Sequence, residues 1–397
     1  MKLAERMARI GTETAFEAAA RARALEATGR SVIHLEIGEP DFDTPANIRD
    51  AAKRALDRGA THYTPTPGIP ELRSAIASDA TARKGFAVTP DRVVVVPGGK
   101  PVMFFAVLAL VDEGDEVIYP DPGFPIYESM ARYVGGRAVP CPIRQENGFR
   151  LDPDELASLV TPRTRLVILN SPANPTGGVS TRGDLERIAA MAREYDFTIL
   201  ADEIYGRILY EGEHVSIASL PDMAERTIVL DGFSKTYAMT GWRLGYAILP
   251  EPLVTPFTRL IVNSVSCTNA ATQWAGVEAL TGPQDSVDAM VAEFKGRRDL
   301  IVDGLNAIPG VKCLRPAGAF YAFPDISATG LTGAELADRL LNEGGVSALA
   351  GTAFGQAGRY HLRFSYATSR ENIAEAVRRT RAVVEPLVEA RRGGTVR

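Results

Sequence analysis

The sequence predicts an α/β protein: a mostly parallel sheet flanked by helices, followed by a smaller α+β part. Five short segments are almost uniformly apolar and show little alternation, which is typical of strands buried on both faces. Helix-like segments alternate with several of them, as in a parallel sheet with helical crossovers. Most of these strands end in polar or glycine-containing loops, and open α/β sheets bind ligands at the carboxyl ends of their strands. We therefore expect these loops to line one crevice.

The first 45 residues indicate a helix, a strand and a loop. Residues 13–28 are rich in alanine, with arginine and glutamate spaced around the turns, and Gly29 follows as a helix stop. SVIHLEIG at 31–38 predicts a short strand, and the turn-forming residues at 38–45 predict a loop.

The middle of the chain carries the alternating pattern, which predicts a large domain over residues 46–283. The expected strands are VVVV, VIY, LVIL, TILA and TIVL, at 93–96, 117–119, 166–169, 198–201 and 227–230. The expected helices lie at 47–56, 71–84, 101–111 and 184–195.

The C-terminal part predicts a second, smaller domain, built from residues 1–45 and 284–397. Its expected elements are a long helix at 284–307, a strand at 320–326, a helix at 333–341, a strand at 360–367 and a last helix that ends near 390.

Composition narrows the possible functions. With 44 basic and 49 acidic residues, the net charge is −5, which argues against nucleic acid or an anionic membrane as a partner. The three cysteines show no CxxC spacing and the four histidines no HExxH pair, so we expect neither a disulfide framework nor a metal site. No run of about 18 apolar residues occurs, so no membrane span is expected and the predicted location is the cytoplasm.

The strongest signal for chemistry is GFSKTYAMTGWRLG at residues 232–245. A single lysine after a strand is usually only a solvated charge. Here Lys235 follows small residues at a strand end and Arg243 lies eight residues on, a spacing that would suit an imine and an anion in one site. The segment resembles, at each defined position, the lysine signature of class I aminotransferases, which are fold-type I pyridoxal-phosphate enzymes.

Five further motifs support this resemblance, which extends over nearly the whole chain, and the six motifs lie between residues 38 and 367. They are GEPDFDTP (38–45), YTPTPGIPELR (63–73), SPANPTG (171–177), ADEIY (201–205) and HLRFSYA (361–367). Their set and order resemble the subgroup that contains many bacterial aspartate aminotransferases. The resemblance implies the fold-type I fold with a seven-stranded, mostly parallel sheet, the cofactor pyridoxal 5′-phosphate, and a homodimer with shared active sites.

The resemblance also implies catalytic roles. Lys235 matches the lysine that binds the cofactor covalently and then moves a proton on the substrate. Asp202 matches the aspartate facing the pyridine nitrogen, where a carboxylate favours the protonated ring. Tyr205 and Asn174 match residues that donate hydrogen bonds to the phenolic oxygen of the cofactor, and Phe124 matches the aromatic ring that stacks on the pyridine. Without the motifs, the Asp and Asn would be ordinary turn residues and the Phe a core residue.

Two anions must also be bound. For the cofactor phosphate, the resemblance implies Gly99 and Lys100 at a helix N-terminus, together with Ser234 and Arg243. It implies that Tyr63 reaches the phosphate of the neighbouring subunit. The matching residues for the substrate are Arg363, which clamps the α-carboxylate, and Gly38, whose backbone approaches the same group, with Phe124 and Asn174 also in contact.

Three features depart from the family pattern: two single residues and one helix. Gly232 stands where many relatives have a phosphate-binding serine, and Ala350 replaces a common proline. The helix after Lys100 (PVMFFAVLAL) carries no charge, so it offers no cation to an acidic substrate side chain.

The expected reaction moves an amino group from an L-amino acid to 2-oxoglutarate, oxaloacetate or pyruvate by a ping-pong mechanism, with aspartate as the first choice of donor. Alternatives are an aminotransferase for aromatic or neutral aliphatic amino acids, a pyridoxal-phosphate β-lyase on the same fold, and a cofactor-sensing domain without catalysis. The last would need a DNA-binding module, for which the motifs leave no room.

Overall fold

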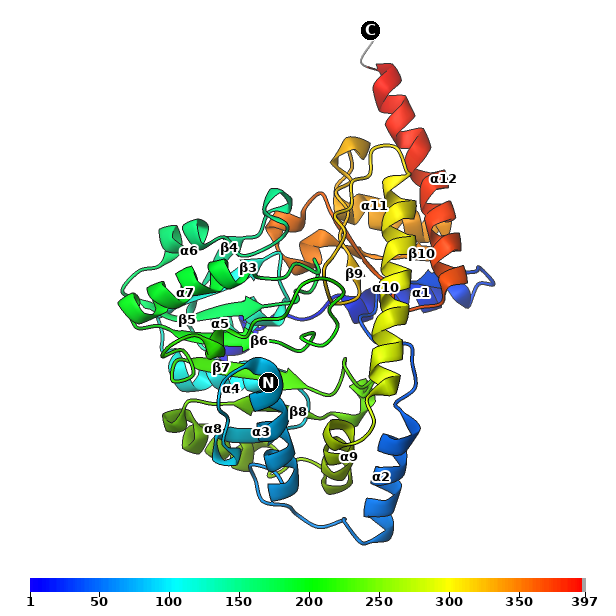
Figure 1. The fold of residues 1–397 in the computed structure, drawn as a ribbon. Helices are drawn as coiled ribbons and strands as arrows, with labels where there is room; N and C mark the ends of the chain where they lie inside the picture. Colours follow the sequence, from blue (N-terminus) through cyan, green and yellow to red (C-terminus); the bar gives the residue numbers. More distant parts are fainter. Residues whose placement is uncertain (395–397) are drawn as a thin grey trace.

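The computed structural model describes residues 1–394, and its centre is a seven-stranded sheet flanked by helices (Figure 1). The strand order is β2-β8-β7-β6-β5-β3-β4. The strands are β2 (Val93–Val96), β3 (Glu116–Asp121), β4 (Arg137–Pro142), β5 (Thr164–Asn170), β6 (Thr198–Asp202), β7 (Thr227–Gly232) and β8 (Gly245–Ile248). Only β8 runs antiparallel to its neighbours, so the predicted mostly parallel sheet is confirmed.

Two strands, β4 and β8, lie outside the five apolar segments. β4 contains Pro140 and Pro142 and lies at the edge of the sheet, where a missing backbone N–H is tolerated. β8 has only four residues and begins with a glycine. Neither pattern resembles an ordinary buried strand.

Helices cover both faces of the sheet because its strand residues are apolar on both sides. Val94 and Val96 pack toward α4 (Lys100–Leu110), α5 (Ile126–Tyr133) and α8 (Glu251–Ser264). Val93 and Val95 pack toward the opposite side, which carries α3 (Pro70–Lys84) and α9 (Ala270–Thr281). The remaining helices of this part are α2 (Ala46–Asp57), α6 (Pro153–Leu159) and α7 (Arg182–Tyr195).

The smaller part of the molecule combines N-terminal and C-terminal segments of the chain. The two-residue β1 (Ile33–His34) pairs in parallel with β10 (Val346–Ser347), and α1 (Ala15–Glu26) precedes it. An antiparallel sheet joins β11 (Leu349–Ala350), β12 (Leu362–Ser365) and β9 (Tyr321–Ala322). The helices are α10 (Asp285–Asn306), α11 (Gly333–Arg339), which continues into a π-turn (Leu340–Gly344), and α12 (Arg370–Gly394). The N-terminal segment is thus positioned beside the elements that carry Arg363.

Candidate active site

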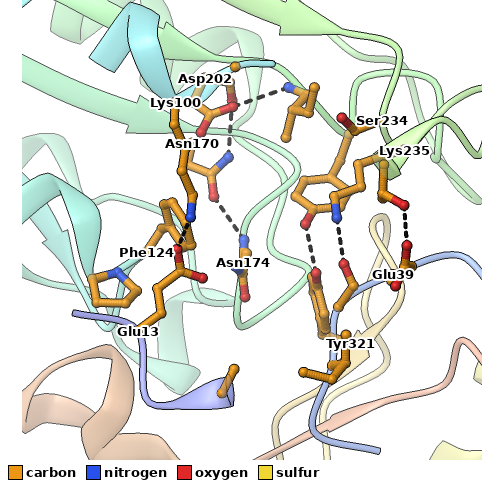
Figure 2. Close-up of a pocket in the computed structure, with 18 of the residues that line it drawn as sticks. Glu13, Glu39, Lys100, Phe124, Asn170, Asn174, Asp202, Ser234, Lys235 and Tyr321 are labelled. Atoms are coloured by element: carbon orange, nitrogen blue, oxygen red, sulfur yellow. Dashed lines mark hydrogen bonds and ion pairs between the residues drawn. The ribbon is translucent and has the colours of Figure 1, made fainter. Parts of the chain in front are cut away.

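A cavity of about 540 Å³ lies at the carboxyl ends of the central strands (Figure 2). Loops after β2, β3, β5, β6 and β7 line it, and the N-terminal segment and the β11–β12 region complete it. Eleven of the twelve residues that the sequence singled out line this cavity: Gly38, Gly99, Lys100, Phe124, Asn174, Asp202, Tyr205, Ser234, Lys235, Arg243 and Arg363.

Lys235 is presented just beyond the end of β7 and is half-buried. Its Nζ donates a hydrogen bond to the backbone oxygen of Gly38. Burial lowers the pKa of Lys235 to about 8, although the nearby carboxylate of Glu39 opposes the shift. A substantial fraction of the amine is therefore neutral near pH 8, which is the form that attacks a carbonyl.

Asp202 is the last residue of β6, the strand next to β7. One carboxylate oxygen accepts a hydrogen bond from Tyr127 Oη at 2.7 Å and the other accepts the amide of Ile204 at 3.3 Å. Burial raises the pKa of Asp202 to about 6, and both hydrogen bonds oppose the rise. A positively charged partner in the cavity would restore the ionised form.

Asn170 joins the loops that carry the candidate site residues. Its Nδ2 donates to the backbone oxygen of Asp202 at 3.0 Å, and its Oδ1 accepts the amide of Asn174 at 2.8 Å (Figure 2). The sequence analysis did not single out Asn170 or Tyr127. Asn170 follows an apolar strand directly, which is a usable signal, whereas Tyr127 lies in a helix with no distinguishing pattern.

Arg363 lies on β12 with its guanidinium between two rings. Its Cζ is 4.7 Å from the ring centroid of Tyr321 and 4.8 Å from that of Phe354. Its Nη1 donates to Asn174 Oδ1 at 3.2 Å, and its Nη2 donates to the backbone oxygen of Glu36. Among the described residues, its buried Nε has no partner. The arrangement fixes the plane of the guanidinium and leaves a donor for a bound carboxylate.

The hydroxyls of Tyr205 and Tyr321 lie 2.7 Å apart, which connects the loop after β6 to the Arg363 group. Tyr321 and Phe354 were also missed by the sequence analysis. Both belong to apolar segments of the C-terminal part, where an aromatic residue is usually core.

Gly98, Gly99, Ser234 and Arg243 form a small cradle at the start of α4. Gly99 is the N-cap residue of that helix, and Ser234 lies in the adjacent loop after β7. Arg243 adopts a left-handed conformation, and its Nη1 donates to the backbone oxygen of Thr240 at 2.8 Å. At Gly98, where φ is +87°, a Cβ atom would lie 2.1 Å from Arg243 Nη2. A helix N-terminus with an arginine in close contact suits a phosphate-sized anion.

Lys100 is the first residue of α4, but its ammonium extends away from the cradle and along the cavity. It pairs with the carboxylate of Glu13 and lies 5.7 Å from the ring centroid of Phe124 (Figure 2). Glu13 belongs to the segment before α1, which the sequence analysis left out of the site. Lys100 therefore places a cation in the cavity, although the rest of α4 carries no charge.

Tyr63 is the one predicted site residue outside the cavity. It is 89% exposed, so within this chain it contacts none of the groups above.

Among residues 1–394, no cluster of three or more metal-ligating side chains occurs. The same residues form no helix that could span a membrane.

Comparison with known proteins gives a consistent family. The model of the family "Aminotransferase class I and II" matches residues 30–379. An aspartate aminotransferase of Pyrococcus abyssi is 42% identical over 89% of this chain and 92% of its own. An aromatic-amino-acid aminotransferase of Thermococcus litoralis is also 42% identical, with the same coverage. The structure of a Thermus thermophilus aspartate aminotransferase with maleate is 40% identical, covers 96% of this chain and all of its own, and has a TM-score of 0.92. The chain belongs to the class I and II aminotransferase family and is an enzyme similar to the aspartate aminotransferases.

Proposed function

We propose that this enzyme uses pyridoxal 5′-phosphate to move an amino group from an L-amino acid to a 2-oxo acid, with aspartate as the preferred donor. One observation carries the proposal. Neighbouring strands present Lys235 and Asp202 to a cavity that also contains a fixed arginine for each of two anions, Arg243 and Arg363.

The residues present fit this cofactor. The neutral amine of Lys235 would bind its aldehyde, and the cradle of Gly99, Ser234 and Arg243 would bind its phosphate. Asp202 would face its ring nitrogen, with Phe124 beside the ring plane. When bound, the cofactor withdraws electrons from the substrate Cα.

The chain's own groups supply the remaining chemistry. Arg363 orients the substrate by its α-carboxylate, which places the Cα–H bond near Lys235. Lys235 would take the proton from Cα as a free amine and, as the resulting ammonium, deliver it on the other side of the substrate nitrogen, at the former aldehyde carbon of the cofactor. Asp202 holds the proton on the ring nitrogen through an ion pair that lowers the carboxylate pKa again.

Similarity to aspartate aminotransferases supports the choice of donor, and the cavity offers one cation for a second carboxylate, Lys100. That cation is already paired with Glu13, so an acidic side chain would have to replace Glu13. The apolar lining by Phe16, Leu349 and Phe354 favours aromatic or neutral aliphatic donors as the second candidate.

A donor and acceptor panel tests this function. Purified protein loaded with pyridoxal phosphate should show a visible absorption band that an amino acid shifts in the absence of any acceptor. Aspartate, glutamate, tyrosine and alanine should each be assayed with 2-oxoglutarate, oxaloacetate and pyruvate. Lys235→Ala should abolish turnover and the shift. Activity retained in that variant, or pyruvate and ammonia released without an acceptor, would contradict the proposal.

We also propose a homodimer with shared sites, a cytoplasmic location, and the division into domains at residues 46–283 and at 1–45 with 284–397. The exposure of Tyr63 supports a shared site, and three free cysteines suit a reducing compartment.

A further inference from the structure

A buried cluster of charges lies behind the candidate site, on the opposite side of the sheet. The Lys84 ammonium, at the end of α3, is 2.7 Å from Glu203 Oε2 and 2.8 Å from Asp231 Oδ2. The three side chains are 1%, 4% and 8% exposed. Burying three charges is costly unless each has a partner, so a cluster of this kind calls for an explanation beyond ordinary packing.

The two carboxylates belong to the strand ends that present the site residues. Glu203 follows Asp202 directly, but its carboxylate pairs with Lys84, whereas Asp202 lines the cavity. Glu203 also begins the turn to Tyr205, since its backbone oxygen accepts the amide of Gly206 at 2.8 Å.

Asp231 holds the second strand end. Its Oδ1 accepts the amide of Gly232 at 2.7 Å, and Gly232 opens the loop that carries Ser234 and Lys235. Lys84 thus connects, through two carboxylates, the loop of Asp202 and the loop of Lys235.

Other polar and charged groups surround the cluster. Ser216 Oγ donates to Glu203 Oε1 at 2.6 Å, and His214 Nε2 lies 3.2 Å from Glu203 Oε2. From α3, Arg83 pairs with Asp79 and acts electrostatically on Asp231, as does the phenol of Tyr246 on β8.

The electrostatic consequences agree with this geometry. Burial opposes ionisation of Glu203, but Lys84 and His214 outweigh it and lower the pKa of that carboxyl. Burial likewise opposes the charge of Lys84, but Asp231 and Glu203 raise its pKa. The negative charges of Asp231 and Glu203 also raise the pKa of Asp202, so a cation between them limits that effect.

We infer that Lys84 is a positioning residue for the proposed reaction: from behind the sheet it fixes the two strand ends and balances their charge, which keeps Asp202 ionised. This inference rests on the proposed function. Lys84 contacts neither the cavity nor any residue that would touch substrate.

The test measures the visible absorption band of the bound cofactor as a function of pH, on the full-length loaded enzyme. The midpoint is the pH at which half of the bound cofactor is protonated. Lys84→Met removes a positive charge, favours the protonated cofactor, and should raise the midpoint by about one pH unit. Asp231→Asn removes a negative charge and should lower it by a similar amount. The double variant keeps the net charge of the cluster and should return close to the unmodified enzyme.

A purely structural role predicts a different pattern. Each single variant would then unfold at a lower temperature with an unchanged midpoint, and this result would overturn the inference. Lys53→Met, which removes an exposed lysine on α2, is the matched control and should leave the midpoint unchanged. If Lys84→Met does not fold, the double variant must still lie about one unit above Asp231→Asn. Absence of any cofactor band in the unmodified protein would instead refute the proposed function.

Discussion

At the scale of single residues, the proposed chemistry depends on the low pKa of Lys235. Because burial lowers this pKa to about 8, covalent uptake of pyridoxal phosphate by cofactor-free enzyme should accelerate as pH rises from 6 and level off above 8. A solvated lysine would keep accelerating toward pH 10 or above. Glu39 raises the pKa of Lys235, so Glu39→Gln should shift the midpoint to lower pH. The rate of appearance of the absorption band measures both effects, and a midpoint near 10 would contradict this account.

Arg363 provides the second prediction at this scale. Lys in its place keeps the charge but loses the planar fork and the two ring contacts. Losing one charge-assisted hydrogen bond costs about 1.5–3 kcal/mol, so Arg363→Lys should lower kcat/KM by about tenfold to 100-fold for every amino donor. The absorption band of the cofactor should persist.

The matched control is Arg359→Lys, an exposed arginine in the same region whose guanidinium lies over the Tyr360 ring. It should leave kcat/KM unchanged. An equal loss in both variants would assign the effect to the surrounding structure rather than to substrate binding.

The motifs singled out residues that the proposed chemistry would constrain most tightly and that line one cavity, but not the residues that contact them. The motifs pointed to Asp202, Asn174 and Arg363 because the proposed chemistry requires one particular functional group at each of these positions. Tyr127 and Tyr321 each place a hydroxyl against a predicted site residue, but both are buried in hydrophobic clusters, where a tyrosine cannot be told from a core residue by sequence. Only the folded arrangement shows which ring reaches the site.

At the scale of elements, position 98, in the turn from β2 into α4, requires glycine for two separate reasons. Gly98→Ala adds the cost of a positive φ, about 1 kcal/mol, and also displaces Arg243. Gly114→Ala carries the same backbone cost at φ +88° but meets nothing within 4 Å. Both variants should lose similar stability to heat, whereas only Gly98→Ala should weaken cofactor binding, by about tenfold or more. Equal cofactor affinity in the two variants would exclude this cradle as the phosphate site.

The pattern of apolar segments predicted five of the seven central strands. β4 was not predicted because it contains two prolines, which argue against a strand. They are tolerated here because β4 lies at the edge of the sheet and pairs on one side only. β8 was not predicted because it begins with a glycine and lacks the uniformly apolar composition of β2, which has the same length; pairing with β2 and β7 makes it a strand. The expected strand at 31–38 shrinks to β1, since only Ile33 and His34 pair in register with β10, although Leu35 also hydrogen-bonds to Ser347 and Ser365.

At the scale of the whole molecule, the proposed role of Tyr63 in a neighbouring subunit predicts that the active unit contains more than one chain. Tyr63→Phe should weaken cofactor binding although the residue contacts no other predicted site residue of its own chain. Tyr195→Phe changes another exposed tyrosine and should have no effect.

Mixed assemblies give a sharper form of this prediction. Tyr63→Phe and Lys235→Ala subunits, unfolded together and refolded, should form heterodimers in which one site has both native residues. Cofactor affinity at that site should match the unmodified enzyme. A Tyr63→Phe, Lys235→Ala double variant mixed with itself should show no recovery. Failure of the mixed sample to recover would place Tyr63 outside the partner's site.

The insertion of β8 between β2 and β7 also orders events as the chain emerges from a ribosome. Gly98 and Arg243 are far apart in sequence and meet only when the edge of the sheet is complete. A nascent chain that ends before β8 therefore has no cradle, whatever else has folded. A ligand that binds only finished molecules shifts the equilibrium toward them by mass action. The proposed cofactor would thus stabilise the finished sheet as well as supply the reaction.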